Sequence, residues 1–333
     1  MTRITLAVGL FFLAPLMGEY LIGNVPTSQL PGILILAPMY GGAALLIREV
    51  TRSTGRGWPT MLTLAAAYGL LQPAIIDQSL FNPAFDGHDF TAAPTYLPAL
   101  GLDPGLLITF TAGHTITSLA VPIALMEALA RRRATTPWLR TPGLIVTITL
   151  FAAGTWLIYD EHQRSFQATP LQLGISAVVV LLLAAAAFRF PRTPHAVALV
   201  SGDGSHNATS AATNRAASRP ASLAHRPRPW QAGLAAALAV TLYTLRPETW
   251  PGLILGVLLL TAAATLIAHW SHHPGWSRRH ITCLAAGAAV TPLWTGFVLL
   301  DITGQATPPH LIGQAAVVTV VIAVLTAAVR AAR

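Results

Sequence analysis

Apolar residues run along this chain in long blocks that are separated by short polar segments. Ten of the blocks are long enough, or nearly so, to cross a bilayer as helices, for which about 17–25 apolar residues are needed. They lie near 4–23, 31–48, 59–77, 104–129, 142–159, 171–189, 231–245, 250–269, 280–300 and 312–329. The pattern predicts an all-α polytopic membrane protein with about ten transmembrane helices.

A long polar stretch divides these helices into two groups. Residues 190–230 are rich in Ala, Ser, Arg, Pro and His and show no apolar periodicity, which is typical of a disordered linker. We therefore expect a membrane domain of six helices over 1–189 and a second membrane domain of four helices over 231–333. The linker between them is expected in the cytoplasm.

The composition fits this membrane interpretation. The chain of 333 residues is 53% hydrophobic and 10% charged, whereas soluble domains are about 25% charged. Its single cysteine, Cys283, excludes an internal disulfide and a thiolate metal cluster. Neither a nucleotide-binding loop nor a metal or haem motif is visible, so no cofactor is expected.

The arginines predict the orientation. All 20 basic residues are arginine, and with the N-terminus inside and ten crossings only Arg164 and Arg246 fall outside. An excess of arginine in cytoplasmic loops is the positive-inside rule, so both termini are expected in the cytoplasm. The rule also accounts for the formal charge of +8 without nucleic acid, and membrane lipid is the expected partner. The absence of lysine from a chain rich in Ala, Gly and Pro favours the plasma membrane of a high-GC bacterium.

Polar residues within the apolar blocks are the candidate functional residues, because a polar group in the bilayer usually faces the protein interior or water. At the spacing of an α-helix, Thr111, His114, Thr115 and Ser118 share one face of the fourth block. The candidates for a substrate or proton pathway are Glu19, Gln72, Asp77, Thr111, His114 and Ser118. Prolines interrupt several of the same blocks, which favours a polar chamber that opens outward among the first, third and fourth helices.

Each of these features also has a purely structural explanation. The Thr and Ser hydroxyls can bond to carbonyls of their own helix, and His114 can hold a neighbouring helix. Arg48, Glu49, Glu127 and Arg131 at the inner surface are expected to form interfacial ion pairs rather than a site. The segment Asp86-Gly87-His88-Asp89 in the outer loop is either a cation ligand set or a solvated turn held by the loop's aromatic residues.

One motif suggests a family. Phe110 and His114 form an F-x-x-x-H pattern that resembles the second motif of the CAAX-protease and bacteriocin-processing membrane family, whose founding members are intramembrane endopeptidases. That family's first motif, E-E-x-x-x-R, should lie on an earlier helix, but residues 72–77 contain neither glutamate nor arginine. Since a glutamine amide cannot replace glutamate as the base that activates water, the resemblance implies an inactive relative.

The sequence thus leaves several functions open. A transporter or permease with an outward polar cavity near His114 and a small-molecule substrate is favoured over an enzyme, and no catalytic or metal-binding residue is assigned. The alternatives are a membrane partner or assembly protein without catalytic activity, which would bind another protein, and a degenerate intramembrane protease. An active enzyme would use His114 as base with Glu19 as its carboxylate partner.

Overall fold

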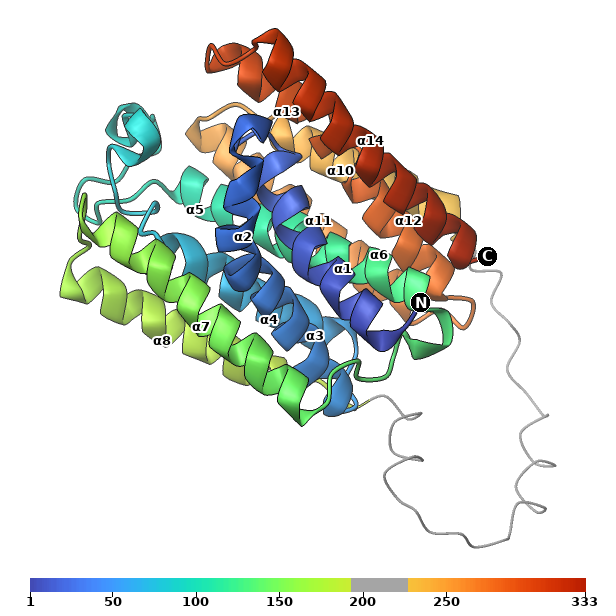
Figure 1. The fold of residues 1–333 in the computed structure, drawn as a ribbon. Helices are drawn as coiled ribbons and strands as arrows, with labels where there is room; N and C mark the ends of the chain where they lie inside the picture. Colours follow the sequence, from blue (N-terminus) through green and yellow to red (C-terminus); the bar gives the residue numbers. More distant parts are fainter. Residues whose placement is uncertain (193–226) are drawn as a thin grey trace, which may run out of the picture.

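The computed structural model describes residues 1–192 and 227–333, and its regular elements there are all helices (Figure 1). Nine helical segments in this part of the chain are long and apolar enough to cross a membrane: Arg3–Tyr20, Thr27–Ser53, Trp58–Ile76, Pro104–Arg133, Thr141–Gln163, Pro170–Ala187, Trp250–Ser271, Arg278–Ile302 and Pro308–Ala331. Each coincides with a predicted block. The remaining block forms α10 (Pro229–Thr244), whose 16 residues are too few for that criterion. Most of the predicted linker, residues 193–226, lies outside the described residues.

The first and third segments continue an α-helix into a π-helical turn, and the second and fourth contain a π-helical turn between two α-helices. The first consists of α1 (Arg3–Pro15) and η1 (Leu16–Tyr20), and the second of η2 (Thr27–Gly32), α2 (Ile33–Leu36), η3 (Ala37–Gly41) and α3 (Gly42–Ser53). The third consists of α4 (Trp58–Leu71) and η4 (Gln72–Ile76), and the fourth of α5 (Pro104–Gly113), η7 (His114–Ala120), α6 (Val121–Ala130) and η8 (Arg131–Arg133).

The later segments are simpler. They are α7 (Thr141–Gln163), α8 (Pro170–Ala187), α11 (Trp250–Ser271), α12 (Arg278–Ala288), α13 (Pro292–Ile302) and α14 (Pro308–Ala331). Proline occupies the first helical turn of most of them, where its missing N–H is not needed. Thr169 adds a capping box to α8, because its hydroxyl accepts from the Gln172 N–H while the Gln172 side chain bonds back.

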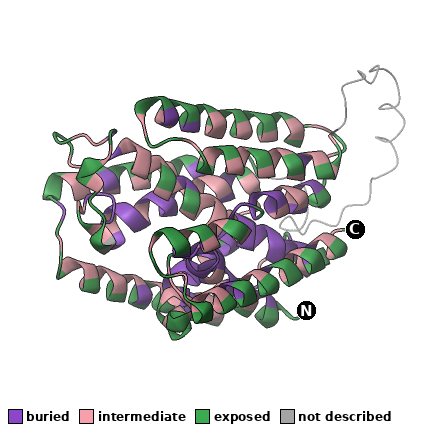
Figure 2. Cartoon of the chain, turned by 90° about the horizontal axis from the view of Figure 1, so that it is seen from above, coloured by how far each residue is buried: buried purple, intermediate pink, exposed green. Residues whose placement is uncertain are grey.

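The helices are arranged as a buried centre within an apolar shell. Residues of α1, η3, α4 and α6 form the main buried cluster, whereas few residues of α7, α8 and α11 are buried. Figure 2 shows the buried residues gathered inside the bundle and the exposed residues on its outer surface. On α8 the side chains of Leu181 and Leu182 are 68% and 64% exposed. Such large exposed leucines on a helix of high hydropathy are what a lipid-facing surface requires.

Four hydrogen bonds gather the arginine-bearing segments at one end of the bundle. Arg133 donates to the Met1 carbonyl, Arg56 to the Phe188 carbonyl and Arg278 to the Arg131 carbonyl, and His280 bonds to the Pro227 carbonyl. Both chain ends lie there in Figure 1. We call this the arginine-rich end. Arg164 and Arg246 lie at the opposite end, where Arg246 donates to the Thr109 hydroxyl in α5.

Candidate functional site

The four π-helical segments η1, η3, η4 and η7 surround one cavity. Pro38 and Pro73 lie within η3 and η4, and Pro15 and Pro122 lie next to η1 and η7. A proline removes one hydrogen bond of the helix ladder, and a π-helical turn accommodates one extra residue. π-Helical turns are rare and frequent at functional sites, so four of them around one space mark that space as the candidate site.

The cavity has a volume of about 880 Å³ and reaches from the middle of the bundle to the loops at the opposite end. Its wall includes Glu19 of η1, Tyr40 of η3, Gln72 of η4, and His114 and Ser118 of η7. Small-molecule sites typically measure about 300–1,000 Å³. The cavity therefore has the size of a ligand site, and it combines an apolar lining with a few polar groups.

Five of the six predicted pathway residues line this cavity. They are Glu19, Gln72, Asp77, His114 and Ser118, whereas Thr111 does not line it. The predicted polar stripe is divided between two neighbours, the cavity and helix α4. The Thr115 hydroxyl donates to the Thr111 carbonyl at 2.6 Å, and both atoms approach Gly69 of α4. These two threonines thus serve helix packing, while His114 and Ser118 face the cavity.

In the cavity wall, Tyr40 contacts both Glu19 and His114. Its ring centroid lies 5.7 Å from that of His114, and its hydroxyl is within hydrogen-bonding reach of the Glu19 carboxylate. Asn24 donates to Glu19 from the other side at 3.3 Å, and the His114 Nδ1 lies 3.3 Å from the Ser118 hydroxyl. Tyr40 is absent from the sequence-based candidates, although Pro38 marks the interruption that positions it.

Gln72 and Asp77 form a pair at the end of the third span that lies away from the arginine-rich end. The Gln72 amide nitrogen donates to Asp77 at 2.6 Å, and the Ser79 N–H donates to the same carboxylate at 2.9 Å. Burial raises the pKa of the Asp77 carboxyl above its ordinary value, and the bonds from Ser79 and Gln72 oppose this rise. The side-chain oxygen of Gln72, Oε1, is buried and has no hydrogen-bond partner among the described residues.

Aromatic contacts hold the outer loop against the cavity. Phe85 stacks on His162 with centroids 5.4 Å apart, and His88 stacks on Phe90, which meets Phe110 edge-on. Asp89 accepts from the Thr91 N–H and hydroxyl, bonds that lower the pKa of its carboxyl. Within the described part of the chain no group of three His, Cys, Asp or Glu side chains is arranged to hold a metal. His88 and Asp89 thus take part in the packing and capping of this loop.

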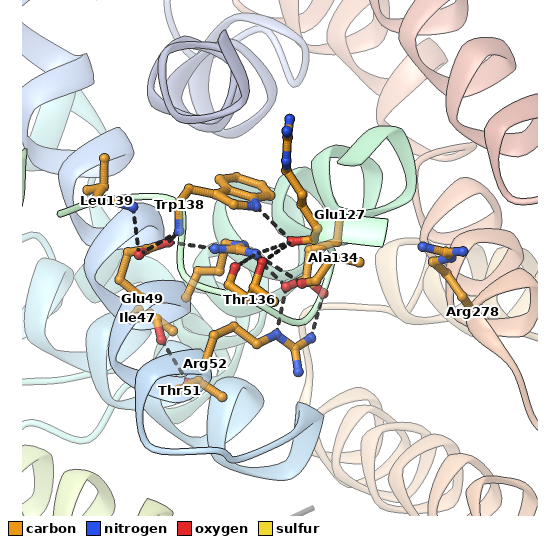
Figure 3. Close-up of polar contacts among 12 residues, drawn as sticks. Ile47, Glu49, Thr51, Arg52, Glu127, Ala134, Thr136, Trp138, Leu139 and Arg278 are labelled. Atoms are coloured by element: carbon orange, nitrogen blue, oxygen red, sulfur yellow. Dashed lines mark hydrogen bonds and ion pairs between the residues drawn. The ribbon is translucent and has the colours of Figure 1, made fainter. Parts of the chain in front are cut away.

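A network of buried charges closes the bundle near the arginine-rich end (Figure 3). Arg52 of α3 donates to both oxygens of Glu127 on α6, at 2.8 and 2.5 Å. Arg48 lies 2.5 Å from Glu49 and 3.2 Å from Glu127, and its guanidinium stacks over the Trp138 ring. These four charged side chains are at most 9% exposed. The predicted ion pairs are confirmed for Arg48, Glu49 and Glu127.

The same network organises the loop before α7. The Glu49 carboxylate accepts from the N–H groups of Trp138 and Leu139, and Arg48 donates to the carbonyls of Arg133, Ala134 and Thr136. The prediction that Arg131 joins these ion pairs was wrong. Arg131 has a φ of 52° at the end of α6, and Arg52 supplies the second guanidinium instead. Arg52 lies four residues after Arg48, about one helical turn along α3, and this spacing was the signal in the sequence that could have identified it.

Comparison with known proteins gives one match. A family model described as an uncharacterized membrane protein family matches residues 9–332. The chain belongs to this family. The match includes all four π-helical segments, the cavity and the buried charge network, so these features lie within the family's region of the chain. No curated protein matches the chain, and no solved structure does. The family membership and the nine apolar helices together make the chain a multi-pass membrane protein.

Proposed function

We propose that this member of the uncharacterized membrane protein family is a transporter, and that its substrate path passes through the cavity among the four π-helical segments. The observation that carries the proposal is the convergence of these segments on a cavity of about 880 Å³ with Glu19, Gln72 and His114 in its wall. Interrupted helices around a central site are a common plan in transporters. The cavity reaches one end of the bundle and the charge network closes the other, as in one state of alternating access.

The proposal includes a membrane topology. With α10 as a tenth crossing, six helices precede residues 190–230 and four follow them, and both termini lie on one side of the membrane. The gathering of the arginines at one end supports the cytoplasm of a bacterium as that side. The cavity then faces outward.

A second candidate is an inactive relative of the CAAX-protease and bacteriocin-processing family. Phe110 and His114 both line the cavity beside Gln72, which favours this candidate. The amide of Gln72 is engaged by Asp77, however, and a glutamine cannot act as a general base. A membrane partner without catalytic activity would need only a static, closed charge network.

Cysteine labelling distinguishes these functions. In a Cys283→Ser background, Thr117→Cys introduces a thiol into the cavity wall, and Ala124→Cys introduces one on α6 between Ser118 and Glu127. A membrane-impermeant maleimide is applied to right-side-out and inside-out vesicles. Because covalent labelling accumulates a minor conformation, we expect the Thr117→Cys thiol to react from outside and the Ala124→Cys thiol to react from the arginine-rich end.

The control is Leu181→Cys on α8, where the leucine is 68% exposed on the surface assigned to lipid. Its thiol should react from neither side. A Thr117→Cys thiol that reacts from outside, together with an Ala124→Cys thiol that never reacts from the arginine-rich end, would contradict alternating access and favour the static partner.

A further inference from the structure

We propose that the cavity selects a small organic cation, an apolar body that carries a protonated amine. The inference rests on the proposed function, because it names the class of substrate for the same cavity. Three independent properties of the wall support it: its charge, its unused hydrogen-bond acceptor and its aromatic rings.

The charge of the wall is the first property. Glu19 and Asp77 line the cavity, and none of the described residues that line it is an arginine; the sequence contains no lysine. The three lining histidines each pack on an aromatic ring: His88 on Phe90, His114 on Tyr40 and His162 on Phe85. Arg246 contacts two lining residues, since it donates to the Thr109 hydroxyl and stacks over the Tyr243 ring, but it does not itself line the cavity. The ionisable acidic groups of the lining therefore favour a cation.

The unused acceptor is the second property. Gln72 is 4% exposed, its side-chain nitrogen donates to Asp77 at 2.6 Å, and its side-chain oxygen has no partner among the described residues. A buried acceptor without a partner is costly, and a donor on a ligand would recover that cost. An ammonium group has three donors and no acceptor, so it complements a wall of carboxylates and an amide oxygen.

The aromatic rings are the third property. Tyr40, Phe90 and Phe110 line the cavity, and the Tyr40 ring lies 5.7 Å from that of His114. Ring faces attract a cation within about 6 Å and also pack against an apolar body. A carboxylate or phosphate ligand would instead require guanidinium or N–H donors, and the Asn24 amide already donates to Glu19.

Equilibrium dialysis of the full chain in detergent tests the inference. The probe is radiolabelled phenethylamine, with empty detergent micelles as background. Its competitors are unlabelled phenethylamine and cyclohexylethylamine, and two isosteres without the positive charge, the neutral 2-phenylethanol and the anionic 3-phenylpropionate. We expect saturable binding that both amines displace and that neither uncharged nor anionic isostere displaces at equal concentration.

Variants locate the binding. Glu19→Gln should weaken binding about ten- to a hundredfold, the factor expected for loss of a charge-assisted hydrogen bond. The matched control is Glu161→Gln on α7, since Glu161 is exposed and pairs with Arg164 outside the cavity; its affinity should be unchanged. The comparison of isosteres on the native chain stays informative if Glu19→Gln fails to fold.

The outcomes separate this inference from the proposed function. Equal displacement by all isosteres, preference for the anion, or no saturable amine binding at millimolar concentration would each overturn the amine assignment. If the cysteine labelling still showed access from both sides, the transporter proposal would stand with another substrate. Selective amine binding without access from the arginine-rich end would instead support the amine site and remove transport.

Discussion

At the scale of single residues, the Arg52–Glu127 pair carries the largest energetic consequence. The two side chains share a bidentate contact within the helix bundle, and Arg48 lies within 3.2 Å of the same carboxylate. Transfer of charges from water into a helix bundle is costly, and only mutual pairing with added hydrogen bonds offsets this cost. Removal of one partner therefore leaves uncompensated charge, which is worse than removal of the whole network.

Glu127→Gln should accordingly destabilise the protein by about 3–5 kcal/mol, because two guanidinium groups lose their shared carboxylate. The measurement is the thermal unfolding midpoint in detergent at fixed lipid content. Glu161→Gln is the matched control, because an exposed ion pair contributes about 0–1 kcal/mol. Equal midpoints for the two variants would show that the network contributes no more than a surface pair.

The sequence predicted individual residues where a polar side chain interrupts an apolar block. Glu19, Gln72 and His114 stand out for this reason, and the structure places them on one cavity. Tyr40 was missed because a tyrosine in an apolar block does not differ from a packing residue. Arg52 was missed because its partner, Glu127, is 75 positions away along the chain.

At the scale of elements, the prolines indicate where the helices are interrupted but not how the backbone responds. The π-helical turns shift the register after each interruption. Helical spacing groups Thr111 with His114, but it does not show that Thr111 and Thr115 pack against Gly69 of α4 rather than line the cavity.

Helix contacts at these turns are unusually close. Gly41 in η3 lies against the backbone of Phe11 in α1, so that a methyl group there would overlap the Phe11 carbonyl.

Gly41→Ala should therefore force α1 and η3 apart and cost about 1–3 kcal/mol, the usual penalty for overpacking. Gly174→Ala on α8 is the control, because its added methyl group meets no atom and alanine favours the helix by about 1 kcal/mol. The thermal midpoints of the two variants should shift in opposite directions. A Gly41→Ala protein as stable as the native chain would mean that the close approach is not required.

At the scale of the whole molecule, the second group of helices packs on the first. Helices α12 and α14 contact α6, and α11 contacts α5, so the chain on both sides of residues 193–226 contributes to one bundle. The sequence predicted the ends of all nine candidate spans to within a few residues, since lipid imposes a length and an apolar composition on each. Contacts between helices have no comparable signature, because small residues throughout the chain allow many pairings.

The unequal distribution of arginines means that the two ends of the bundle differ in their susceptibility to trypsin. This protease cleaves after Lys and Arg but not before proline. On the opposite end Arg246 is followed by Pro247, which leaves Arg164, with a side chain 69% exposed, as the susceptible position. Trypsin added to right-side-out vesicles should therefore cut the chain into two halves of nearly equal mass, whereas inside-out vesicles should yield several fragments that each contain two spans. Cleavage after Arg278 or Arg279 in right-side-out vesicles would show that α10 does not cross. Because few bonds at this end are susceptible to trypsin, the cavity would open on the face of the membrane that resists the protease.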